Sequence, residues 1–136
     1  MLTIKSVRRI GAAALIVPGI DHLISPTLTM LFAPMIMDTM FGQGFVAATI
    51  FFIVLGLFQL VWILVLLKST NSPLLVLGVF ANLVSILIYF VSTSGVTIFG
   101  VPPQPLILFG VLVKALETVF VVASLYVIRA IRTGKH

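Results

Sequence analysis

The chain has 136 residues, of which 61% are hydrophobic and 8% charged, and its mean hydropathy is +1.33. In soluble domains about a quarter of the residues are charged, so this composition indicates an integral membrane protein. The net charge of +5 comes from Lys and Arg that flank apolar stretches, so it does not indicate nucleic-acid binding. Because the sequence contains no cysteine, it excludes disulfides, thiolate metal sites and CxxC redox chemistry.

In chain order, four stretches are long and apolar enough to cross a bilayer, for which a helix needs about 20 residues. They predict spans at about 3–24, 45–67, 74–91 and 106–128. The sequence therefore predicts an all-α integral membrane four-helix bundle made by one domain, residues 1–136. The basic start of the first span resembles a signal peptide. No small-x-small cleavage site follows it, however, so we expect a retained anchor.

The distribution of basic residues predicts the orientation of the bundle. Apart from Lys114, the Lys and Arg residues all fall on one side of a four-span arrangement, and they are Lys5, Arg8, Arg9, Lys68, Arg129, Arg132 and Lys135. Cytoplasmic loops of membrane proteins are enriched in Lys and Arg. We therefore expect a multi-pass protein of the cell membrane with both termini in the cytoplasm, and outer loops at residues 25–44 and 92–104.

Small and polar residues recur at helical spacing along one face of each span. These residues are Gly11, Ala14, Pro18 and His22 in the first span, Thr49, Gly56 and Gln59 in the second, Gly78, Asn82, Ser85 and Tyr89 in the third, and Gly110, Lys114, Glu117 and Ser124 in the fourth. In a membrane, small residues let helices approach closely and buried polar side chains must find partners. We therefore expect these faces to point into the bundle.

Some of these residues are predicted to form an intramembrane polar layer. Its members are Asp21, His22, Gln59, Asn82, Lys114 and Glu117. Counting residues from the basic ends of the spans places Gln59, Asn82 and Glu117 at a similar depth. Lys114 follows one turn further out, near the first-span members.

The charged pair of the fourth span needs an explanation, because a charge at the centre of a spanning helix costs about 2.5 to 3.5 kcal/mol. Lys114 and Glu117 are one helical turn apart, so they can pair with each other and lock the packing of the helices. They can also serve proton or ion handling, or the binding of a metal or small ligand. These three interpretations stay open at the level of the sequence.

The outer segment of residues 28–41 is too apolar for an ordinary loop and too short to cross the membrane. We expect it to lie in the outer interface or to enter the membrane as a re-entrant piece. It contains Met30, Met35, Met37 and Met40, and His22 lies just upstream. Thioether and imidazole groups suit Cu(I), so copper is a candidate ligand. The alternative is that methionine supplies adaptable apolar contacts to lipid or a partner.

No phosphate-binding loop, serine-triad signature or HExxH motif occurs in the sequence. His22 and His136 are its only imidazoles. We therefore expect no catalytic residues and no enzymatic activity from this chain alone. This expectation is compatible with a role as a subunit of an enzyme complex.

Short motifs occur in order along the chain, and they are "GIDHLISP", "GLFQLVW", "GVFAN", "GVPPQP" and "KALETVFV". Together they resemble a family of small four-span archaeal and bacterial membrane proteins of unassigned activity. The resemblance implies that His22, Gln59, Asn82 and Glu117 correspond to recurring polar positions of that family. Members often carry an arginine soon after the third span, where this chain has Ser92-Thr93-Ser94.

The chain also looks like the small accessory subunits of the membrane-bound copper monooxygenase of ammonia-oxidising archaea. That resemblance implies larger membrane subunits as partners and copper in the complex. We therefore expect a non-catalytic accessory subunit of a hetero-oligomer, with Trp62 and the aliphatic outer faces of the second and fourth spans against lipid or neighbours. Two alternatives are a small oligomeric proton- or ion-coupled transporter that uses Glu117, and a copper-handling protein that uses the Met-rich segment with His22.

Overall fold

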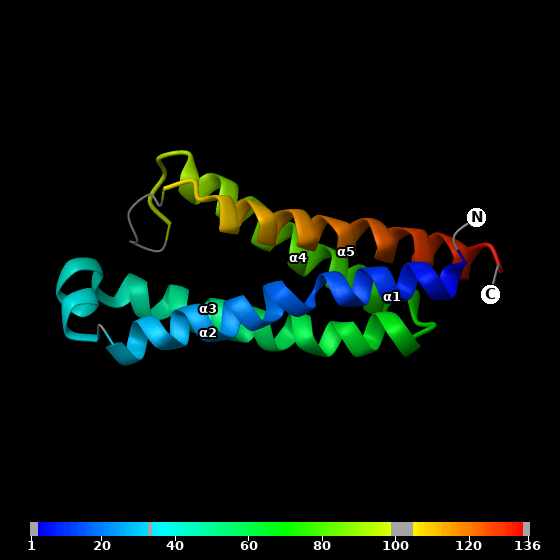
Figure 1. Cartoon of the computed structure of the whole chain (residues 1–136), viewed down its shortest axis with the longest axis horizontal. Helices are drawn as coiled ribbons and strands as arrows, with labels where there is room; N and C mark the ends of the chain where they lie inside the picture. Colours follow the sequence, from blue (N-terminus) through cyan, green and yellow to red (C-terminus); the bar gives the residue numbers. More distant parts are fainter. Residues whose placement is uncertain (1–2, 33, 99–104, 135–136) are drawn as a thin grey trace.

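The computed structural model describes residues 3–32, 34–98 and 105–134, with the side chains of residues 30 and 32–45 outside this description. Its helices are α1 (Ile4–Ala14), α2 (Ile16–Phe32), α3 (Pro34–Lys68), α4 (Ser72–Thr93) and α5 (Leu108–Arg132). Figure 1 shows α1 and α2 end to end, alongside α3, α4 and α5 on one long axis, with the start of α1 and the end of α5 at the same end of the bundle.

Four helical segments of the described chain are long and apolar enough to cross a membrane: Ile4–Thr29, Val46–Lys68, Ser72–Thr93 and Leu108–Arg132. Their outward faces carry large apolar side chains; on α3, for example, Val54 and Leu57 are 59% and 54% exposed. Such continuous apolar surface suits lipid and not water. The predicted all-α membrane bundle with four spanning helices is therefore confirmed, and the chain is a multi-pass membrane protein.

The first span consists of α1 and α2, which are separated by a break at Leu15. The cause is Pro18, which has no N–H to donate to the carbonyl of Ala14. The N–H of Leu15 binds the carbonyl of Ala12 at 3.2 Å, three residues back, so the helix tightens here before it resumes. Because of this break, α1 packs against α5 and α3, whereas α2 packs mainly against α3.

Most basic residues lie at one end of the bundle, where α1 starts and α5 finishes, and we call this the basic end (Figure 1). Here Arg8 links α1 to the end of α3. Its Nη1 donates to the carbonyls of Leu66 and Ser69, at 2.6 and 2.8 Å. The last carbonyls of a helix have no partner within the helix, so Arg8 caps the carboxyl end of α3.

An apolar core fills the bundle between the basic end and its middle, and it includes Val7, Leu15, Leu66, Leu75, Phe120 and Val127. Trp62 belongs to this core. It stacks on Phe58 with 3.7 Å between ring centroids, and its Nε1 donates to the carbonyl of Leu74 at 3.2 Å. Trp62 is only 7% exposed, so the prediction that it contacts lipid or neighbouring subunits is wrong. Its indole N–H finds a partner inside the chain, which removes the need for an interfacial position.

The predicted outer segment of residues 28–41 is helical where the structure describes it, as the end of α2 and the start of α3. Pro34 is the first residue of α3, a position where its missing N–H breaks no helical hydrogen bond. The side chains of the predicted copper ligands in this segment lie outside the described residues: Met30, Met35, Met37 and Met40.

Candidate functional site: a buried polar network

Buried polar side chains from four helices meet in the middle of the bundle. They are His22 on α2, Gln59 on α3, Asn82 and Ser85 on α4, and Lys114 and Glu117 on α5, and each is at most 6% exposed. The inward stripes of small and polar residues bring them together, since each lies on the face of its helix that turns away from lipid. We call this set the polar network.

Lys114 is the cation of the network. Its Nζ lies 3.0 Å from both carboxylate oxygens of Glu117, 2.7 Å from Oγ of Ser85 and 3.4 Å from Nε2 of His22. An ammonium group has three protons, so these three partners use all of its donors. Lys114 therefore has no proton left for a further acceptor.

Glu117 is the anion of the network and is 0% exposed. Besides the contacts to Lys114, its Oε1 accepts hydrogen bonds from Nε2 of Gln59 at 2.9 Å and from Oγ of Ser85 at 3.1 Å. A buried charge is costly unless it is paired and hydrogen-bonded. These contacts meet both conditions, so the geometry fits an ionised Lys114–Glu117 pair.

Gln59 connects the pair to the other helices. Its Nε2 also donates to Oδ1 of Asn82, at 2.9 Å, and its Oε1 lies 2.9 Å from Nδ1 of His22. Because an amide oxygen only accepts, Nδ1 of His22 carries the proton and Nε2 is left to accept from Lys114. The contacts therefore fit a neutral imidazole, even though Nδ1 also lies 3.7 Å from Glu117.

The polar atoms of the network are satisfied. The Nδ2 of Asn82 donates to the carbonyl of Gly78 at 2.9 Å, within its own helix. Among the buried side-chain nitrogen and oxygen atoms of the described residues, only Oγ of Ser124 has no partner. A fully satisfied buried network specifies one arrangement of its helices, because other arrangements leave polar groups unpaired in a medium without water.

The structure brings most of the predicted polar layer together, namely His22, Gln59, Asn82, Lys114 and Glu117. Asp21 is separate, and it accepts a hydrogen bond from Oγ of Ser25 at 2.6 Å. Consecutive residues of a helix point about 100° apart, so Asp21 and its neighbour cannot both face the network. Ser85 is a member that the prediction missed, although it lies one turn after Asn82 on the same inward face.

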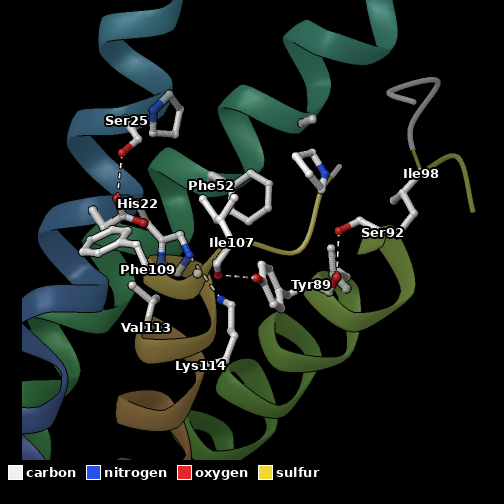
Figure 2. Close-up of a pocket in the computed structure, with 16 residues that line it drawn as sticks. His22, Ser25, Phe52, Tyr89, Ser92, Ile98, Ile107, Phe109, Val113 and Lys114 are labelled. Carbon is white, nitrogen blue, oxygen red and sulfur yellow. Dashed lines mark hydrogen bonds between the residues drawn. The ribbon is translucent and has the colours of Figure 1, made fainter. Parts of the chain in front are cut away.

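A cavity of about 440 Å³ lies at the end of the bundle opposite the basic end. Figure 2 shows His22 and Lys114 at its inner end, with Phe52, Tyr89 and Phe109 around it. The cavity is lined mainly by apolar side chains, and Asp21, Ser25 and Ser92 add polar groups. Glu117 does not line it, so Lys114 and His22 separate the cavity from the carboxylate.

The described residues contain no group of three His, Cys, Asp or Glu side chains placed to hold a metal ion. A copper site in the Met-rich segment stays a prediction, because those thioether groups are not described. His22, the imidazole assigned to such a site, has both ring nitrogens within 3.4 Å of Gln59 and Lys114. Binding of a metal by His22 would have to displace one of these contacts.

No family model, curated protein or solved structure matches the chain. The fold and the site therefore define the class of this protein: a small four-helix membrane protein with an ion pair and its hydrogen-bond partners at the centre of the bundle.

Proposed function

We propose that this chain is a non-catalytic membrane subunit that packs within a larger membrane complex and stabilises it. The main support is the saturation of the polar network. Lys114 uses its three protons on partners inside the chain, and Glu117 is 0% exposed. Groups arranged in this way hold helices in place, and they offer no free atom to a substrate.

The proposed partners are other integral membrane subunits. The archaeal membrane-bound copper monooxygenase is the candidate complex, on the basis of the motif resemblance alone. We further propose that the basic end faces the cytoplasm, since Lys and Arg accumulate on that side of membrane proteins. The exposed aliphatic faces of the spans would then meet lipid or those subunits.

The direct test is to purify the native protein from its membrane in a mild detergent and to identify by mass spectrometry what elutes with it. Metal content is measured in the same peak. We expect recovery in fixed ratio with larger membrane subunits. Elution alone or as a small homo-oligomer would contradict the proposal, and copper in fixed ratio to that isolated chain would favour the copper-handling alternative.

Substitutions in the ion pair give a second test. Glu117→Gln leaves the ammonium of Lys114 buried without its counter-ion, and breaking a buried pair in this way costs about 3 kcal/mol or more. The double variant Lys114→Gln/Glu117→Gln removes both charges and keeps amide groups for hydrogen bonding. We expect thermal unfolding in detergent to show a large loss of stability for the single variant and a smaller loss for the double variant. We also expect the double variant to assemble with the partner subunits.

One observation supports a second candidate, a proton- or ion-coupled carrier. The cavity ends at Lys114 and His22, and both contact Glu117. A carrier of this kind would lose proton flux in proteoliposomes in the double amide variant, because the buried carboxylate of Glu117, its proposed titrating group, is gone. If the unsubstituted protein assembles with partner subunits and shows no proton flux in proteoliposomes, this candidate is eliminated.

A further inference from the structure

The cavity opposite the basic end carries a charge that the polar network does not balance. Asp21 lines this cavity, and its carboxylate accepts a hydrogen bond from the neutral hydroxyl of Ser25. In the described residues, Lys114 and Glu117 pair with each other. Every other Lys and Arg of the sequence belongs to the predicted cytoplasmic side. Asp21 also interacts electrostatically with Lys114, but that ammonium is already paired with Glu117, so these three groups together carry a net negative charge.

The walls of the cavity suit an apolar molecule with a positive charge. Phe52, Tyr89 and Phe109 line it, together with the aliphatic side chains of Ile88 and Val113. The face of an aromatic ring attracts a cation, and the attraction grows when water is excluded. A carboxylate beside aromatic rings in an otherwise apolar cavity is thus complementary to an organic cation with apolar substituents.

An anion fits the same cavity poorly. Among the described residues of its lining, Lys114 is the one Lys or Arg, and its protons are taken by Ser85, Glu117 and His22. An anion would have to break one of these contacts and would also approach the carboxylate of Asp21. A cation near Asp21 avoids both costs and leaves the network unchanged.

We propose that this cavity is a binding site for a small lipophilic organic cation, such as a quaternary ammonium or phosphonium ion. Its volume of about 440 Å³ lies within the range of small-molecule sites, roughly 300 to 1,000 Å³. Asp21 supplies the counter-charge, and the aromatic rings contact the substituents. The site goes beyond the proposed subunit function and does not depend on it.

The test uses two ions of the same shape and opposite charge, tetraphenylphosphonium and tetraphenylborate. Each is measured by equilibrium dialysis against the purified full chain in detergent, with protein-free micelles as the blank. We expect saturable binding of the phosphonium, with one ion per chain, and at least about tenfold weaker binding of the borate, which corresponds to about 1.4 kcal/mol.

Two variants locate the site. Asp21→Asn removes the charge from a residue outside the polar network, and we expect it to weaken phosphonium binding by about tenfold or more, since the ion loses its counter-charge. Thr27→Ala is the matched control, because Thr27 is on the same helix outside the cavity lining and its hydroxyl donates to the carbonyl of Leu23. We expect its affinity to stay within about threefold of the unsubstituted protein, a difference below 1 kcal/mol.

A third variant tests the cavity without changing charge. Ala48 lines it, and Ala48→Phe would fill part of the space, so we expect phosphonium binding to be lost. Thermal unfolding shows whether each variant is folded. If Asp21→Asn does not fold, Ala48→Phe and the comparison of the two ions decide. Equal binding of both ions, unchanged binding in folded Asp21→Asn or Ala48→Phe, or no saturable binding would each overturn the proposal.

Discussion

Gln59 is the residue on which the polar network most depends. A single amide group contacts His22 on α2, Asn82 on α4 and Glu117 on α5, so one side chain of α3 connects the remaining spans. Both ends of the amide are used, as donor and as acceptor. No apolar residue of similar size can replace these contacts, and this makes Gln59 the most informative site for substitution.

We expect Gln59→Leu to lower the free energy of unfolding by about 3 kcal/mol, since it leaves Nδ1 of His22 and Oδ1 of Asn82 buried without partners. The measurement is thermal or denaturant unfolding in detergent, followed by circular dichroism. Ser124→Ala is the control, because Oγ of Ser124 is buried and already lacks a partner. Its removal is expected to be neutral or slightly stabilising.

The two variants separate hydrogen bonding from burial. Both replace a fully buried polar group by an apolar one. If Gln59→Leu were as well tolerated as Ser124→Ala, the network would contribute nothing to stability, and the structural interpretation of the ion pair would fail with it.

At the scale of the helices, two glycines differ in how easily their neighbours could make room for a larger residue. A Cβ at Gly78 would lie 2.0 Å from Cδ1 of the buried Trp62, whereas a Cβ at Gly110 would lie 2.5 Å from the hydroxyl of Tyr89. Trp62 is buried, stacks on Phe58 and donates to the carbonyl of Leu74, so shifting it would break these contacts. Tyr89 is half-buried and borders the cavity, so its ring has room to shift.

We therefore expect Gly78→Ala to destabilise the bundle by about 2 to 3 kcal/mol, the upper part of the usual range for overpacking a core. Gly110→Ala is expected to cost less than half as much. Unfolding midpoints of the two variants in the same detergent give the comparison. Equal losses would show that Trp62 is as free to move as Tyr89.

The helical pattern of the sequence was sufficient to predict the inward faces of the helices. Counting along the spans also placed Gln59, Asn82 and Glu117 at one depth, and they are hydrogen-bonded in the structure. Depth along a helix does not give the direction of a side chain around it, which is why Asp21 was grouped with His22. The break at Leu15 changes that direction further.

The burial of Trp62 could not be predicted for a different reason. In a membrane protein an apolar side chain has no hydrophobic penalty on the lipid side, so hydropathy does not distinguish lipid from core. The space that receives Trp62 is made by Gly78 on another helix, and its N–H partner is a backbone carbonyl. Both are features of tertiary packing that leave no local pattern in the sequence.

For the molecule as a whole, polarity changes in three steps along the bundle axis. The apolar core lies next to the basic end, the polar network follows in the middle, and the cavity opens at the opposite end. The apolar core holds the helices together near the basic end. Toward the opposite end, α2 packs mainly against α3 and less against α5, and the cavity that Asp21 lines opens there.

The orientation of the bundle is testable because the sequence has no cysteine. Val96→Cys places one thiol in the link between α4 and α5, and Thr133→Cys places one just after α5, both at exposed positions. In intact cells we expect a membrane-impermeant maleimide to label position 96 alone. Labelling of position 133 should require lysis, and the reverse pattern would show that the basic end faces outward.

The position of both charges on one helix also bears on how the protein is made. Lys114 and Glu117 are three residues apart on α5, so the last span can enter the bilayer with its charges already paired. The earlier spans contribute only the neutral groups of His22, Gln59 and Asn82 to the network, and a bilayer tolerates these at lower cost than an unpaired ion. We therefore expect the first three spans to insert before any charge of the network is present, and α5 to complete the network when it inserts.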